Sequence, residues 1–135
     1  MKTINIKAAS DNTGKVTDFI NEQLEEMLCP MKTQMQIDVA VEEIFTNIVN
    51  YAYDGQVGDV EISVDMPEDG RTVVITFKDW GQEYNPLMRE EPDISLSADE
   101  RPIGGLGILL VKKLMDDVTY QFNENCNILK LKKAI

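Results

Sequence analysis

The segment from Gln36 to Tyr53, QIDVAVEEIFTNIVNYAY, carries two stripes of side chains at helical spacing. An α-helix turns through about 100° per residue, so residues three and four positions apart lie on one face. The apolar stripe repeats at spacings of four, three and four and consists of Ile37, Val41, Ile44 and Ile48. The segment therefore predicts a helix that buries this stripe, and the core must be built against it.

A polar stripe repeats at spacings of four and three on a neighbouring flank of the same helix. It consists of Glu43, Asn47 and Asn50 and places a carboxylate and two amides about one turn apart. A solvated flank beside a core face explains this pattern. Asn is a mediocre helix former, so the two amides also raise the possibility of a binding or catalytic site. The residues by themselves leave both interpretations open.

Composition indicates a single globular domain over residues 1–135. The chain has 43% apolar and 27% charged residues, which is typical of neither a disordered nor a membrane protein. No apolar run approaches the roughly 18 residues that a membrane-spanning helix needs. The first ten residues, MKTINIKAAS, alternate polar and apolar side chains and do not resemble a signal peptide. We therefore expect a cytoplasmic protein.

Charge and residue usage exclude several classes of function. The formal net charge is −11, from 24 acidic and 13 basic residues, so nucleic acid and anionic membrane surfaces would be repelled. The chain has no histidine, which excludes Ser-His-Asp and Cys-His catalysis, histidine metal sites and histidine autophosphorylation. Cys29 and Cys126 are isolated and form no C-x-x-C motif, so we interpret both as small hydrophobic residues.

Hydrophobic periodicity predicts an alternation of strands and helices along the whole chain. Period-two patterns predict strands, the first of them near a sheet edge, and 3.6-residue patterns predict helices. In order, we expect an edge strand at 3–8, a helix from 16 that ends before Pro30, the long helix to about 53, a hairpin of 60–66 and 73–79, a helix at 108–115, and a closing hairpin of 118–122 and 128–131.

Asp79 continues the odd-numbered series of Val73, Ile75 and Phe77 in one predicted strand. The period of two therefore directs its carboxylate to the core face. A carboxylate in the core is costly unless hydrogen-bond donors compensate it. The alternative is that Asp79 ends the strand and turns to water, where it caps the Trp80-Gly81 turn.

Residues 82–103 show no periodicity and contain three of the five prolines. Loops this long in small domains are often functional, and we interpret this one as a lid. It leads into Gly104-Gly105-Leu106-Gly107, which opens the predicted helix at 108–115. Glycines let a ligand approach the backbone, and a helix N-terminus attracts phosphate, although an ordinary glycine turn explains the same residues.

Together these motifs resemble the ATP-binding domain of the GHKL superfamily, most closely the single-domain anti-sigma-factor serine-protein kinases of bacteria. EEIFTNIVNYAY is similar to the N box of that family, KDWGQEYNP to its first glycine box and GGLGILLVKKLMDDVTY to its second. The resemblance covers nearly the whole chain. It implies an α/β (α+β) two-layer sandwich, with a mixed, largely antiparallel sheet of about five strands and three main helices on one face.

The resemblance also implies roles for the residues of the N box and the first glycine box. Asn47 would coordinate the Mg²⁺ that bridges the ATP phosphates, and Glu43 would be the catalytic base that accepts the proton of the attacking serine. Asn50 would add a contact near the phosphates. Asp79 would accept a hydrogen bond from the adenine amino group, and Gly81 would leave room for the ring.

Further implied roles lie in the lid and the second glycine box. Gly104, Gly105, Leu106 and Gly107 would form the phosphate-binding turn, with backbone N–H groups directed at the nucleotide. Arg101 would approach the γ-phosphate. The chain departs from its relatives at Tyr51, where they commonly carry histidine, and at Gln82-Glu83, where a further glycine is often found.

Two functions follow from the resemblance. The first is an ATP- and Mg²⁺-dependent serine-protein kinase of a partner-switching circuit, which phosphorylates a small antagonist protein on serine and sequesters a sigma factor or comparable effector. Its relatives often form homodimers. The second is a nucleotide-responsive binding module that sequesters a regulatory partner without transferring phosphate.

Overall fold

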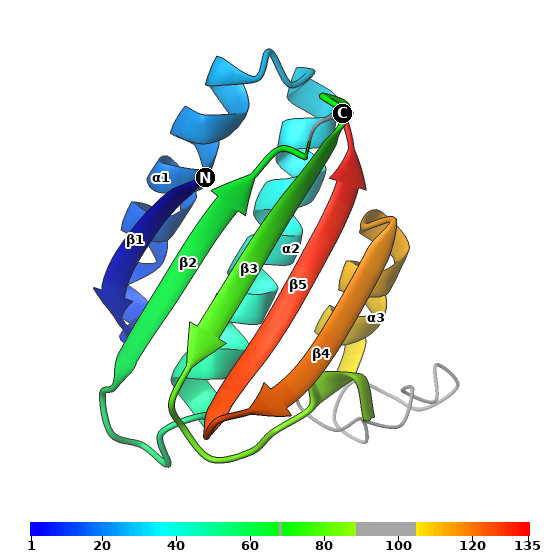
Figure 1. Cartoon of the computed structure of the whole chain (residues 1–135). Helices are drawn as coiled ribbons and strands as arrows, with labels where there is room; N and C mark the ends of the chain where they lie inside the picture. The colour runs from blue at the N-terminus through cyan, green and yellow to red at the C-terminus, as the bar shows by residue number, and fades with distance from the viewer. Residues whose placement is uncertain (68, 89–104) are drawn as a thin grey trace.

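The computed structural model describes residues 1–67, 69–88 and 105–135 of the chain. In this part the chain forms two layers, a twisted sheet in front and three helices behind it (Figure 1). The elements in chain order are β1 (Lys2–Lys7), the 3₁₀ turn η1 (Ser10–Asn12), α1 (Thr13–Glu26), α2 (Met31–Tyr51), β2 (Asp59–Asp65), β3 (Thr72–Asp79), the 3₁₀ turn η2 (Pro86–Met88), α3 (Gly105–Leu114), β4 (Asp117–Asn123) and β5 (Cys126–Ala134). The predicted two-layer architecture is confirmed.

The described strands form one sheet in the order β1-β2-β3-β5-β4. Strand β1 lies at one edge, as predicted. All four pairings among the described strands are antiparallel, whereas we expected a mixed sheet. The reason is that β2 and β3, and likewise β4 and β5, are joined as hairpins, and the second hairpin enters the sheet with β5 antiparallel to β3.

The core lies between the sheet and α2. The four residues of the predicted apolar stripe are all buried, with at most 8% of any of them exposed. They face the inward residues of the central strands, which alternate as the period of two requires. The stripe and the strand alternation therefore place the two layers as predicted, and α1 and α3 lie on either side of α2 (Figure 1).

Helix α2 ends at Tyr51, two residues before the predicted end. Asp54 and Gly55 adopt left-handed backbone conformations, with φ of 49° and 83°, which a helix cannot continue through. Tyr53 leaves the helix and packs its ring against Gly58, where a Cβ would overlap the ring. Its hydroxyl donates to the carbonyl of Asp59 and accepts from the N–H of Trp80 at 2.9 Å. The short loop thereby ties α2 to the ends of β2 and β3.

The turn between β4 and β5 consists of Glu124 and Asn125, with φ of 54° and 64°. Two consecutive left-handed residues are typical of a type I′ hairpin turn. This turn lies within the loop that the sequence predicted. Both cysteines are free, Cys126 buried and Cys29 packed against the core, which confirms their interpretation as small hydrophobic residues.

No helix in the described residues is both long and apolar enough to cross a lipid bilayer.

Candidate functional site

A pocket lies between the second half of α2 and the adjoining ends of β3 and β5. It brings together two side chains from separate predicted motifs, Asn47 and Asp79. The space in it that water can occupy is about 30 Å³, enough for one or two water molecules, so a larger ligand enters only if the walls move. The lining residues are Ile44, Asn47, Ile48, Ala52, Phe77, Asp79, Tyr84, Pro86, Tyr120, Asn127 and Leu129.

Asp79 ends β3 with its carboxylate in the core, and only 4% of the residue is exposed. Its Oδ1 accepts hydrogen bonds from the N–H of Gly81 and from Nδ2 of Asn127, each at 2.9 Å. Burial raises the pKa of this carboxyl, and the two hydrogen bonds partly oppose the rise. The predicted inward orientation is confirmed. Both donors among the described residues engage Oδ1, so Oδ2 keeps its acceptor capacity.

Asn127, on β5, holds Asp79 in this position, and sequence reasoning missed it. It lies opposite Asp79 in the register and is 6% exposed. Its Nδ2 also donates to the carbonyl of Gln82 at 2.8 Å, while its Oδ1 accepts from the N–H of Tyr84 at 3.1 Å and from the hydroxyl of Tyr120 at 2.5 Å. A signal existed, because Asn127 precedes Leu129 and Leu131 in an inward series, just as Asp79 ends one.

Asn47 is 7% exposed and lines the pocket from the flank of α2 next to the core stripe. Its Nδ2 is buried and has no hydrogen-bond partner among the described residues. An unpaired buried amide is unusual, since burial of a polar group without a partner is costly. The amide oxygen and nitrogen are interchangeable by rotation. The side chain therefore fits a group that lies in the pocket, such as phosphate for its N–H or a hard cation for its oxygen.

Glu43 is half-buried one turn before Asn47 and does not line the pocket. Its carboxylate lies against Gly107 in the first turn of α3, where a Cβ would overlap Oε2. Burial, and secondarily the charge of Glu42, raises the pKa of Glu43. Asn50, the third member of the predicted polar stripe, is exposed and also lies outside the pocket lining.

Gly81 has a packing reason to be glycine. A Cβ at this position would overlap the backbone carbonyl of Ala52 at the end of α2. The same carbonyl accepts a hydrogen bond from the N–H of Gln82 at 2.8 Å. The turn after β3 is therefore closely packed on α2, which directs the N–H of Gly81 at Asp79. The role of Gly81 beside an adenine ring stays a prediction.

Tyr51 supports one wall of the pocket. Its ring stacks on that of Tyr84, with centroids 5.2 Å apart and an angle of 28° between the rings. Its carbonyl accepts a hydrogen bond from Nε2 of Gln82 at 2.7 Å. Tyr51 thus holds the segment 82–84 against α2, while Glu83 is exposed.

Arg101 and Gly104 lie outside the described residues, as does most of the predicted lid at 82–103. Helix α3 begins at Gly105, so Gly105, Leu106 and Gly107 form its first turn, as the glycine-rich helix entry predicted. The described residues contain no group of three or more acidic or cysteine side chains arranged to hold a metal ion.

Comparison with known proteins identifies the family. Residues 6–133 match the family described as histidine kinase-like ATPase domain. The chain is 32% identical over 96 residues to a serine-protein kinase RsbW of Bacillus cereus, a match that covers 70% of this chain and 60% of the relative. The serine-protein kinase RsbW of another Bacillus cereus strain is 29% identical over 118 residues, or 86% of this chain and 68% of the relative. The first match thus spans about three-fifths of its relative.

Two solved structures share the fold. The RsbU and RsbW domains of a Mycobacterium tuberculosis protein superpose with a TM-score of 0.66 at 18% identity, over 98% of this chain and 32% of that one. The histidine kinase domain of a blue-light activated histidine kinase from Erythrobacter litoralis gives a TM-score of 0.58 at 15% identity, over 92% of this chain and 59% of that one. With the match over residues 6–133, these findings show that the chain belongs to the histidine kinase-like ATPase domain family.

Proposed function

We propose that the chain binds ATP in the pocket between α2 and the ends of β3 and β5. The observation that carries the proposal is that two buried polar side chains line the same small pocket. Asp79 keeps an acceptor oxygen beside the space, and Asn47 has an unpaired amide there. Asp79 would accept a hydrogen bond from the adenine amino group, between the apolar side chains of Ile48 and Phe77.

The pocket must widen before it admits a base. Its walls, around a water-accessible volume of about 30 Å³, include Tyr84 and Pro86, which belong to the segment after β3. Movement of this segment would open the space and leave Asp79 in place, because Asp79 is fixed by β3, Gly81 and Asn127. The segment would then cover the bound nucleotide.

The phosphates would extend toward Asn47 and the first turn of α3. Asn47 would hold a Mg²⁺ ion through its amide oxygen, and the ion, when bound, would neutralise charge on the phosphates. The backbone of Gly105, Leu106 and Gly107 would present N–H groups there, since the first residues of a helix have free donors. Arg101, Gly104 and Asn50 are proposed as further contacts on the strength of the resemblance.

We propose further that the chain transfers the γ-phosphoryl group of ATP to a serine hydroxyl of a small antagonist protein. Glu43 would be the base that accepts the hydroxyl proton, one helical turn from Asn47. The raised pKa of Glu43 favours this role, because a carboxylate with a higher pKa is a stronger base. The relatives named serine-protein kinase RsbW support a serine-protein kinase. The alternative partner would be a sigma factor or comparable effector, as the resemblance implies.

A second candidate function is regulated sequestration of a partner without phosphoryl transfer. The position of Glu43 favours it, since the carboxylate packs against Gly107 and does not line the pocket. In this function nucleotide binding would alter the partner-binding surface, and Glu43 would be a packing residue of the α2 and α3 pair.

Calorimetric titration with ATP, with and without Mg²⁺, tests the nucleotide proposal. We expect one-site binding that Asp79→Asn abolishes and that loses its Mg²⁺ dependence in Asn47→Ala. The matched control is Asn5→Ala, which removes an exposed amide on β1 far from the pocket in the sequence and fold. Absence of binding by the folded wild type at millimolar ATP would refute the proposal. Asn50→Ala in the same series decides whether that exposed amide contributes.

Transfer of radiolabelled γ-phosphate separates the two candidate functions. A candidate acceptor protein with a single serine would be incubated with wild type or Glu43→Gln in the presence of ATP and Mg²⁺. A kinase predicts that Glu43→Gln binds ATP as tightly as wild type but transfers phosphate at least about 100-fold more slowly. Equal transfer by both proteins would exclude Glu43 as the base. Partner binding without transfer by the wild type would favour sequestration.

A further inference from the structure

An exposed apolar stripe runs along the outer face of the first half of α2, on the side turned away from the sheet. Met31, Met35 and Val39 follow at spacings of four, and they are 69%, 61% and 40% exposed. Residues four apart on a helix are neighbours on one face. Isolated exposed apolar residues are ordinary, but a continuous row of large ones on a small domain is a mark of an interaction site.

Leu28 precedes the stripe by three residues in the chain, in the turn between α1 and α2. The N–H of Cys29 donates to the carbonyl of Leu24 and that of Leu28 to the carbonyl of Glu25, each at 3.0 Å. This is a Schellman ending, in which the left-handed position usually holds glycine. Leu28 occupies it with φ of 57° and is 88% exposed. Its backbone is strained without any compensating burial of the side chain in the chain itself.

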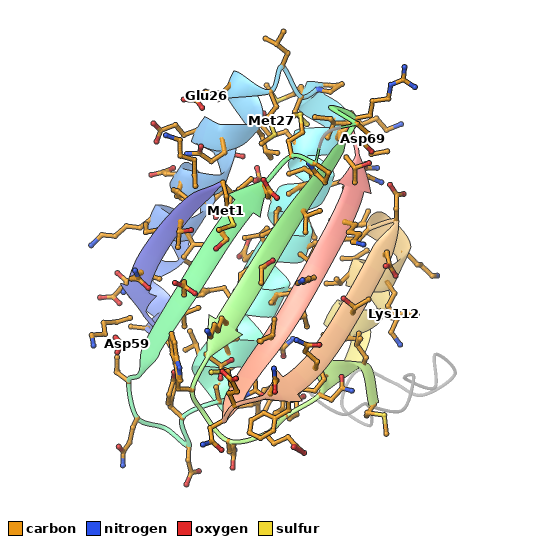
Figure 2. All side chains as sticks on the ribbon, viewed as in Figure 1. Met1, Glu26, Met27, Asp59, Asp69 and Lys112 are labelled. Carbon is orange, nitrogen blue, oxygen red and sulfur yellow. The ribbon has the colours of Figure 1, made fainter. Side chains whose placement is uncertain are left out.

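Leu28 also lines a groove at the same end of the molecule, between the end of α1 and the sheet. Three methionines, Met1, Met27 and Met66, line that groove as well. Figure 2 shows Met1 and Met27 near the same end of the molecule, at the start of β1 and just past the end of α1. Methionine side chains adapt to different partners. Lys2, Glu26 and Asp65 line the groove too. Along the chain, Leu28 thus lies between this groove and Met31, the first residue of α2.

Helix α2, which carries the stripe, and its neighbour α1 are strongly acidic. Two lysines, Lys15 and Lys32, accompany seven carboxylates on α1 and α2, which are Asp18, Glu22, Glu25, Glu26, Asp38, Glu42 and Glu43. None of the seven lies within 4.0 Å of a basic group in the described residues. Asp38 is held by Asn21 of α1, whose Nδ2 donates to it at 2.7 Å in the amide orientation that satisfies both groups.

The carboxylates of α2 repel one another. The negative charge of Glu42 acts together with burial to raise the pKa of both Asp38 and Glu43. A partner that brought basic side chains close to these carboxylates would relieve the repulsion. A second copy of the chain would instead add to it, because a two-fold interface places the same acidic surface on both sides. An anionic membrane surface would be repelled for the same reason.

We infer that Leu28, Met31, Met35 and Val39 form a docking surface for a protein helix whose apolar face is flanked by lysine or arginine. Apolar side chains of the partner would pack on the stripe, with Leu28 as the anchor at its end. The basic side chains would meet Asp38, Glu42 and the carboxylates of α1 and guide the approach. Met35 precedes Asn47 by twelve helical residues, a rise of about 18 Å, so this surface is separate from the nucleotide pocket and does not depend on it.

Two synthetic helical peptides with the same leucine face test the inference, one flanked by lysine and the other by glutamate. The full chain would carry ¹³C-methyl methionine, which gives seven probes. We expect the lysine peptide to shift the methyl signals of Met31 and Met35, and to leave that of buried Met115 unchanged. The glutamate peptide should shift neither. Equal shifts with both peptides, or shifts only at other methionines, would overturn the inference.

Three variants separate a docking surface from general attraction to an acidic protein. Met35→Lys should weaken binding of the lysine peptide at least about tenfold. Val57→Lys adds the same charge at another exposed apolar residue, in the loop before β2, and should change binding less than about twofold. Leu28→Gly should raise the midpoint of thermal unfolding, because glycine suits the left-handed position, and yet weaken binding. Equal affinity of Met35→Lys and Val57→Lys would overturn the inference.

Sedimentation of the wild type and Met35→Lys tests whether a second copy of the chain covers the stripe instead. If the wild type is a dimer that Met35→Lys converts to a monomer, the stripe is covered by a second copy and the inference is wrong. The same mass for both proteins, together with the methyl shifts, supports a partner of opposite charge.

Discussion

Asn127 lies directly opposite Asp79 across β5 and β3, and its Nδ2 donates to Oδ1 of that carboxylate at 2.9 Å. The same amide binds the segment after β3 through the carbonyl of Gln82 and the N–H of Tyr84. One buried side chain therefore fixes both the carboxylate proposed to recognise adenine and the wall that must move to admit it. This and other contacts of the structure lead to three predictions about stability and one about catalysis.

Asn127→Ala should destabilise the fold by about 2–4 kcal/mol, because it leaves a buried carboxylate with one donor fewer and deprives Tyr84 and Tyr120 of an acceptor. Denaturant unfolding measures the change. Asn125→Ala, at an exposed position in the hairpin turn, is not a neutral control, since its φ is 64°. Asn123→Ala, exposed on β4, is the matched control. A loss below about 0.5 kcal/mol would show that the pair is replaceable, for example by water.

Asp79→Asn should stabilise the nucleotide-free chain at neutral pH and reduce the pH dependence of its stability. Burial raises the pKa of Asp79 above the ordinary value of 3.8, so the folded state binds more protons than the unfolded state between those two pKa values. Stability contributed by this group therefore falls as pH rises through that window. Asparagine keeps an oxygen for Gly81 and Asn127 but carries no charge to desolvate.

Thermal unfolding of wild type and Asp79→Asn at a series of pH values checks this expectation. The variant should unfold a few degrees higher at pH 7, the shift that about 1 kcal/mol produces in a domain of this length. The difference should shrink toward pH 4. Asp38 and Glu43 also have a raised pKa, but they titrate in both proteins and cancel in the difference. A variant less stable than wild type at pH 7 would contradict the sign.

Gly81→Ala and Gly107→Ala should differ in their effect although each adds one methyl group. At Gly81 the Cβ overlaps the backbone carbonyl of Ala52, which cannot move without the end of α2, so we expect a loss of about 2–4 kcal/mol. At Gly107 the Cβ overlaps the end of the Glu43 side chain, which can rotate away. We expect a change in stability below about 1 kcal/mol there, measured by denaturant unfolding. A loss at Gly107 as large as at Gly81 would show that Glu43 is rigidly held.

The rate of phosphoryl transfer should rise with pH through the pKa of Glu43 if that residue is the base, because only the carboxylate accepts a proton. Burial and Glu42 raise this pKa, so the transition should lie above that of an ordinary glutamate. Glu42→Gln should lower the apparent pKa and shift the profile to lower pH. Single-turnover rates under saturating ATP measure it. An unchanged pH profile in Glu42→Gln would show that Glu43 is not the group whose ionisation controls the rate.

Much of the site could be predicted because the signals are local. Helical spacing placed Asn47 on a flank beside the core stripe, and strand alternation turned Asp79 inward. The glycine-rich helix entry was also visible. Other residues of the predicted site do not line the pocket with Asn47 and Asp79. Glu43 packs on Gly107 outside the pocket lining, and Asn50 is exposed, because residues of one stripe lie about a turn apart along α2 and meet different neighbours.

The sequence by itself determined where helices and strands form and which of their residues face inward, since the periods of 3.6 and 2 are properties of the local backbone. Only the tertiary structure decided which inward residues meet. Asn127 and Asp79 are 48 residues apart, and the stacking of Tyr51 on Tyr84 also joins separate segments. Such contacts depend on which strands pair and in what register, and the order β3-β5-β4 follows from burial of the whole apolar face of the sheet rather than from any one segment.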